Sequence, residues 1–183
     1  MGQKKTNKNS KYNTRVITYA AILTAAYVVL SMLFKIPVAG TITVDLGYIA
    51  LMVAAVCLGP VSALLVGALG AGIESAIAAS RGLSLGWVLM NAIIGFGCGL
   101  VLSKADSSNK KKFIPKAVFS VIVFCFLGVV VKTFIDCALY KIALELKIPT
   151  GLVAWGLDSF VMLAIGLPLS ITLEKRLGPL STK

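Results

Sequence analysis

Six long apolar stretches, separated by short polar segments, leave this 183-residue chain few possible folds. The stretches cover residues 15–34, 44–58, 61–79, 85–102, 113 to about 146, and 151–173. Only 14% of the residues are charged, whereas soluble domains carry about 25%. Because a membrane-spanning helix needs about 20 mostly apolar residues, the pattern predicts an all-α membrane protein, a compact bundle of six transmembrane helices.

The positive charges predict how this bundle is oriented. Thirteen of the 18 Lys and Arg residues lie in the N-terminal segment, in the loop after the fourth stretch and near the C-terminus, whereas four lie in the opposite loops. Since Lys and Arg accumulate on the cytoplasmic side, both termini are expected inside the cell. We therefore expect a single transmembrane domain over residues 1–183, with a basic cytoplasmic tail (1–14), the bundle (15–176) and a C-terminal tail (177–183).

Several other classes of protein are not indicated. The chain has no histidine, and its four cysteines lie inside apolar stretches without the spacing of a metal site. It has no P-loop, zinc-protease or nucleophile-elbow motif, so we expect neither an enzyme nor a bound cofactor or metal. The net charge of +11 gathers at the ends of the apolar stretches and is not interleaved with aromatic residues, which argues against nucleic-acid binding.

Polar and aromatic residues inside the stretches fall at a similar depth, toward the outer side. At 1.5 Å per residue, Glu74 lies about 21 Å above Pro60, in a hydrocarbon core about 30 Å thick. Ionisable groups in a membrane usually face a cavity or each other, so these residues predict a substrate-binding site in the outer half of the bundle. The candidates are Glu74, Arg81, Trp87, Asn91, Lys132, Asp136, Tyr140, Trp155 and Asp158.

Simpler roles remain open for some of these side chains. Lys132 and Asp136 have the i, i+4 spacing of a helical ion pair. Tyr140 and Trp155 also suit the aromatic belt at the membrane surface. As ligand groups, Lys132 and Arg81 would hold a carboxylate or phosphate.

The order of several short motifs resembles the S component of energy-coupling factor (ECF) vitamin transporters. These motifs are residues 43–48 (TVDLGY), 58–63 (LGPVSA), 66–70 (VGALG), 91–95 (NAIIG) and 165–168 (IGLP), followed by the basic pair at 175–176. Many members carry an acid just after the glycines of the third span, where this chain has Ala71, and the acid here is Glu74. The resemblance implies a six-helix bundle in a prokaryotic plasma membrane that captures a water-soluble vitamin from outside.

The resemblance also implies partners and moving parts. Ala21 and Ala25 would form the small-residue surface that docks on a transmembrane coupling subunit, and two separate ATPase subunits would drive transport. The loop before the second span would act as a lid, through Lys35, Pro37, Gly40, Thr41 and Asp45. Folate, pantothenate, riboflavin, pyridoxine and a modified-base precursor all remain open as ligands, with Trp87 and Trp155 able to sandwich a flat ring. The alternative is a stand-alone carrier coupled to protons or ions, with Glu74 or Asp136 as the coupling acid.

Overall fold

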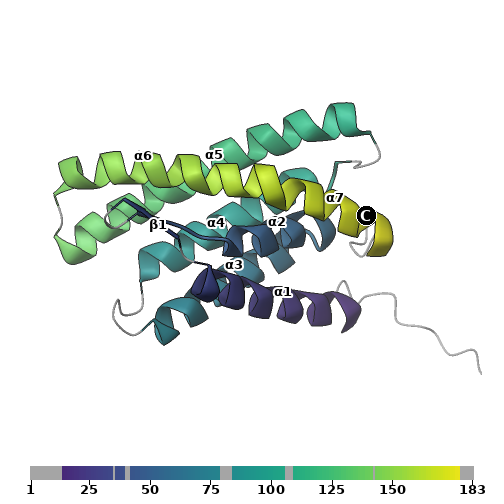
Figure 1. The fold of residues 1–183 in the computed structure, drawn as a ribbon, viewed down its shortest axis with the longest axis horizontal. Coiled ribbons are helices and arrows are strands. Elements are labelled where there is room, and N and C mark those ends of the chain that lie inside the picture. The colour runs from purple at the N-terminus through teal and green to yellow at the C-terminus, as the bar shows by residue number, and fades with distance from the viewer. Residues whose placement is uncertain are drawn as a thin grey trace, which may run out of the picture.

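The computed structural model describes residues 14–34, 36–39, 42–78, 84–105, 109–141 and 143–177. These residues form six helical segments arranged as an antiparallel bundle (Figure 1). The first five are α1 (Thr14–Leu33), α2 (Gly47–Cys57), α3 (Pro60–Ile77), α4 (Leu85–Leu102) and α5 (Lys110–Tyr140). The sixth runs without a break through α6 (Leu144–Val161), a π-helical segment η1 (Met162–Gly166) and α7 (Leu167–Leu177). The expected bundle is confirmed, and five of these helices are long and apolar enough to cross a membrane.

The last loop of the bundle differs from the expected one. Helix α5 was expected to continue to about residue 146, but it ends at Tyr140 and is followed by Lys141 in a left-handed conformation (φ 52°). The sixth helix begins at Leu144 and passes through Pro149, earlier than the expected start at residue 151. Hydropathy could not locate this turn because the apolar stretch continues across it.

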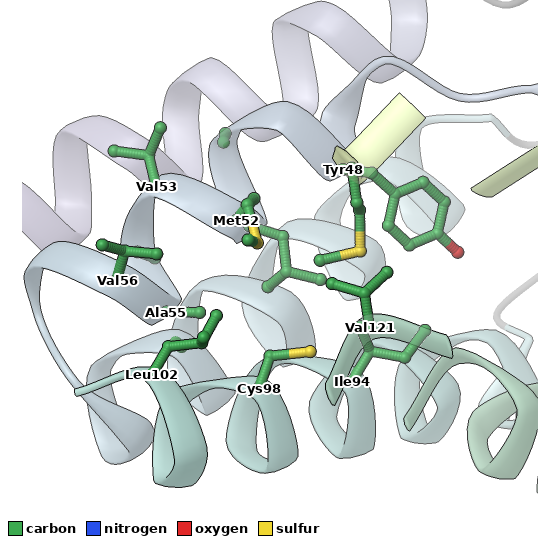
Figure 2. Packing of buried hydrophobic residues seen from close by; sticks show 14 of the residues in the cluster. Tyr48, Met52, Val53, Ala55, Val56, Ile94, Cys98, Leu102 and Val121 are labelled. Atoms are coloured by element: carbon green, nitrogen blue, oxygen red, sulfur yellow. The ribbon is translucent and has the colours of Figure 1, made fainter. Parts of the chain in front are cut away.

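Helix α2 forms the centre of the bundle. Every residue from Gly47 to Cys57 except Ile49 is buried, and the helix contacts α1, α3, α4, α6, η1 and α7. Figure 2 shows Ala55 and Val56 of α2 near Leu102 of α4, whereas Val53 points away from α4. A helix that is apolar on all sides is expected to be surrounded by other helices, and this one is.

Small residues bring α3 against α4. Gly67 lies against the backbone of Asn91, and Gly95 lies against the backbone of Ala63. The small residues that recur at every fourth position of α3, at Ala63, Gly67, Ala71 and Ser75, are all buried. A side chain larger than hydrogen at either glycine would separate the two helices.

The segment expected to be a lid loop is a short β-hairpin. Strand β1 (Ile36–Ala39) pairs antiparallel with β2 (Ile42–Val44), with Ile36 opposite Val44 and an irregular register between Pro37 and Ala39. Strand β2 packs against α6. In Figure 1 the hairpin lies at one end of the bundle and the end of α7 lies at the other. The hairpin therefore covers the end of the bundle where the polar residues were expected.

Candidate functional site

Trp87 is the centre of a polar cluster at the hairpin end of the bundle. It sits in the first turn of α4, where Ser84 caps the helix by accepting a hydrogen bond from the Trp87 backbone N–H (3.4 Å). Its indole N–H donates to Glu74 of α3 (2.7 Å between Nε1 and Oε2). The ammonium of Lys132, from α5, lies 4.7 Å from the centroid of the indole ring. Three helices thus place an acid, an aromatic ring and a cation within direct reach of each other.

Asn91 lies one turn deeper on the same face of α4. It is fully buried, and its side-chain N–H donates to the Trp87 carbonyl (2.9 Å). Its side-chain oxygen accepts a hydrogen bond from the hydroxyl of Tyr27 of α1 (2.9 Å). Asn91 therefore anchors the floor of the cluster and links it to α1, which makes a structural role as well supported as a ligand contact.

Tyr48 and Asp158 bring α2 and α6 into the cluster. The Tyr48 ring stands edge-on to Trp87, with ring centroids 6.3 Å apart. Both Tyr48 and Asp158 are buried (0% and 3% exposed). The Tyr48 hydroxyl has no hydrogen-bond partner of good geometry among the described residues, and Asp158 is an acidic group close to it. In Figure 2 this hydroxyl points away from the apolar side chains of the core.

Asp136 is held by a cation that the sequence analysis did not select. Lys147, near the start of α6, forms an ion pair with the buried Asp136 (3.1 Å between Nζ and Oδ2). The other oxygen of Asp136 and the stem of Lys132 lie against Gly86, where any side chain would collide with them. The ion pair thus joins α5 to α6 beside the Trp87 cluster.

The base of the hairpin is fixed by Asp45. This residue is buried, and its Oδ1 accepts hydrogen bonds from the Ser31 hydroxyl and the Gly47 backbone N–H, both 2.7 Å long. The carboxylate sits at the N-terminus of α2, where the helix dipole favours a negative charge. Asp45 therefore attaches the hairpin to α1 and α2, at the point where a moving lid would hinge.

Two of the expected site residues lie away from these contacts. Tyr140 is half exposed at the end of α5. The Trp155 indole donates to the Ile122 carbonyl (3.0 Å) and packs edge-on against Phe126 of α5. Four expected residues lie outside the described residues: Lys35, Gly40, Thr41 and Arg81. For Pro37, the structure describes the backbone but not the side chain.

Ala21 and Ala25 both lie on the exposed side of α1. The large side chains of Ile17, Ile22 and Val29 are also exposed, and α1 is the least buried of the long helices, with 17% of its apolar window inside the bundle. This face of α1 is therefore open to lipid or to another membrane protein.

Some residues of the cluster were missed because their signal in the sequence is ordinary. Tyr27 and Ser31 are one turn apart on α1 and look like any polar residues in an apolar helix. Lys147 lies 11 residues from Asp136, across a turn whose position hydropathy did not reveal.

Within the described residues, no three His, Cys, Asp or Glu side chains are placed to hold a metal ion.

The fold and the cluster describe a multi-pass membrane protein with a buried polar and aromatic site at one end. Residues 11–175 match the model of the family "ECF-type riboflavin transporter, S component", and the chain belongs to this family. Its fold is similar to that of a crystal structure at 2.1 Å of the S component for biotin from an ECF-type ABC transporter. That match has a TM-score of 0.62 and 21% sequence identity, and it covers 88% of this chain and 92% of the other. The resemblance found in the sequence is thereby confirmed.

Proposed function

We propose that this chain is the high-affinity substrate-binding subunit of an ECF-type importer in a prokaryotic plasma membrane. It captures a water-soluble, vitamin-like molecule from the outside, with both of its termini in the cytoplasm. The observation that carries the proposal is the cluster around Trp87, because six helices contribute buried or partly buried polar or aromatic side chains to one end of the bundle: Tyr27, Tyr48, Glu74, Asn91, Lys132 and Asp158, with Trp87. Polar groups are costly inside a membrane and usually face a cavity or each other, so a cluster of this size at one end of the bundle supports a ligand site.

The aromatic part of the cluster supports a ligand with a flat ring. The rings of Trp87 and Tyr48 form a T-shaped pair, and the Lys132 ammonium lies over one face of the Trp87 ring. A planar heterocycle could stack on these groups or replace the Lys132 ammonium above the indole. Riboflavin, which the family description names, has such a ring and is the first compound to test.

The family and the exposed face of α1 together suggest which protein subunits this chain binds. We propose that the exposed face of α1 with Ala21 and Ala25 docks on a transmembrane coupling subunit, and that two ATPase subunits bound to it hydrolyse ATP. The small side chains allow the close approach on which helix association in lipid depends. The hairpin of strands β1 and β2 would open and close above the cluster, with Asp45 at its base.

Mass spectrometry of the purified protein tests the proposal. The protein, purified in detergent with no ion gradient, should retain a small molecule and should co-purify with ATPase subunits when these are co-expressed. A stand-alone ion-coupled carrier depends on an ion gradient and has no ATPase partner. Tight binding without a gradient, together with co-purified ATPase subunits, would therefore argue against this alternative. Failure to bind any small molecule would contradict the proposal.

Fluorescence can report where the ligand binds, because the chain has only two tryptophans. In the Trp155→Phe variant, Trp87 is the single reporter, and ligand should quench its emission at saturation. In the matched Trp87→Phe variant, Trp155 reports from its site against Ile122 and should respond much less. An equal response in both variants would place the ligand elsewhere.

A further inference from the structure

The first two turns of α5 concentrate positive charge at the end of the bundle where α7 ends (Figure 1). Residues 104–116 contain five lysines and one acid, Asp106, which lies outside the described residues. Four of these lysines begin the helix and are exposed: Lys110, Lys111, Lys112 and Lys116. None of the four is in an ion pair within the described part of the chain. Because the helix dipole already places positive charge at this N-terminus, the lysines favour an anion beside them.

Two of the lysines begin a row of side chains on one face of α5, which we call the α5 stripe. It consists of Lys112, Lys116, Phe119, Val123 and Phe126, at alternating intervals of four and three residues. This spacing keeps side chains on the same face of a helix. The three apolar members are 68%, 39% and 47% exposed, so the face is turned away from the bundle along its length. The α5 stripe is therefore basic at its start and apolar toward the middle of the membrane.

Trp155 of α6 borders the apolar part of the α5 stripe. Its ring packs edge-on against Phe126, with ring centroids 5.7 Å apart, and its indole N–H donates to the Ile122 carbonyl (3.0 Å). At 1.5 Å per residue, Phe126 lies about 15 Å along α5 from Lys116, deeper than the interface where membrane tryptophans usually gather. Since its N–H is paired with the backbone of α5, Trp155 can lie at this depth and widen the apolar surface.

An anionic phospholipid matches both the charge and the length of this surface. Lysines next to a spanning helix attract anionic headgroups, and Lys112 and Lys116 lie where a phosphate would meet them. The chains of one leaflet fill about 15 Å, half of the hydrocarbon core, which is the distance from Lys116 to Phe126. An acidic protein surface would satisfy the lysines, but it would not explain the apolar row that continues below them.

We infer that the α5 stripe binds one anionic phospholipid, with the phosphate held by Lys112 and Lys116 and one acyl chain lying against the apolar residues and Trp155. The site lies at the end of the bundle opposite the hairpin, so the inference does not depend on the ligand of the Trp87 cluster. It also goes beyond a general attraction of a basic protein to a charged membrane, because it assigns the binding to one face of one helix.

Native mass spectrometry of the full chain, released from detergent micelles with added lipid, tests the inference. The probes are dioleoyl phosphatidylglycerol and dioleoyl phosphatidylcholine, which have the same chains and differ in headgroup charge. One phosphatidylglycerol should stay bound at concentrations at which phosphatidylcholine does not. The double variant Lys112→Gln/Lys116→Gln should bind phosphatidylglycerol about tenfold more weakly or worse. Its matched control, Lys175→Gln/Arg176→Gln, removes two exposed charges from α7 at the same end and should leave this affinity nearly unchanged.

Fluorescence in vesicles reports where the acyl chain lies. In the Trp87→Phe variant, Trp155 is the single tryptophan. Phosphatidylglycerol brominated in its acyl chains should quench Trp155 more strongly than brominated phosphatidylcholine at the same mole fraction. Adding Lys112→Gln/Lys116→Gln to this variant should remove the difference between the two lipids, whereas Lys175→Gln/Arg176→Gln should preserve it.

Three results would overturn the inference. The first is equal binding of the two lipids by the parent protein. The second is an equal loss of phosphatidylglycerol in the two double variants, which would mean that only the total charge of this end matters. The third is a Lys112→Gln/Lys116→Gln protein that keeps its lipid preference but no longer co-purifies with the ATPase subunits. The lysines would then bind an acidic protein surface and not a lipid.

Discussion

Two buried tyrosines make a matched pair for testing the cluster in the unliganded protein. Tyr27 and Tyr48 are both fully buried, and the Tyr27 hydroxyl donates to the side-chain oxygen of Asn91 at 2.9 Å, whereas the Tyr48 hydroxyl lies near Asp158 and makes no hydrogen bond of good geometry within the described residues. Replacing Tyr27 with Phe removes this bond and leaves a buried oxygen unpaired. Replacing Tyr48 with Phe removes a hydroxyl that has no partner of good geometry among the described residues.

The two substitutions should change the free energy of unfolding by different amounts or in opposite directions. Hydrogen bonds between membrane helices contribute about 0.6 kcal/mol on average. Leaving the Asn91 oxygen unpaired adds a cost of about 1–3 kcal/mol if water does not reach it. We therefore expect Tyr27→Phe to lower the free energy of unfolding by roughly 0.6–3 kcal/mol. Tyr48→Phe should leave it unchanged or raise it by up to about 1 kcal/mol, because an unsatisfied group is no longer buried.

Equilibrium unfolding of both variants in mixed detergent micelles, without ligand, measures these differences. Ligand affinity should change in the opposite order, with Tyr48→Phe losing binding although it is stable. If Tyr48→Phe is as destabilised as Tyr27→Phe, then the Tyr48 hydroxyl already has a partner in the unliganded protein. The expectation that the Tyr48 hydroxyl is available to a ligand would then be refuted.

Three further predictions concern docking, packing and binding. Ala25→Trp should abolish uptake in cells but leave ligand binding in detergent intact, and loss of both in a folded protein would mean that the residue serves internal packing. Gly95→Ala should destabilise the bundle by about 1–3 kcal/mol, because the methyl group meets the Ala63 backbone. Gly156→Ala is its control, since no atom lies within 4 Å of the added carbon, and equal stability of both variants would contradict the packing. Lys132→Ala should weaken binding by about 1–3 kcal/mol in titrations, and an unchanged affinity would show that the ammonium over Trp87 is not part of the site.

The helices of this protein could be predicted from the sequence because lipid imposes a simple rule on them. A long apolar stretch must form a helix in a membrane, and residues 85–102 were located without error. The close contact of α3 with α4 has a signal in the sequence as well, since small residues at intervals of four, such as Ala63 and Gly67, mark close helix packing. Glu74, Trp87 and Lys132 could be proposed as neighbours because depth along each helix is set by residue count.

The rest depends on facts that hydropathy does not contain. The rotation of a helix about its axis decides whether Trp155 faces the cluster or α5, and the structure turns it toward Phe126. The hairpin depends on the pairing of residues 36–39 with residues 42–44, two segments too short for an apolar pattern to reveal. The ion pair of Asp136 with Lys147 depends on where the turn between α5 and α6 falls.

The short central helix has a consequence for how the protein enters the membrane. At 1.5 Å per residue, the 11 residues of α2 extend about 16 Å, roughly half of the hydrocarbon core. Nearly all of its surface touches other helices, so it has little to offer lipid. Such a segment cannot leave the insertion machinery as an independent span. We expect α2 to remain beside α1 until α3 has been synthesised, so that the three helices pass into the bilayer as one unit.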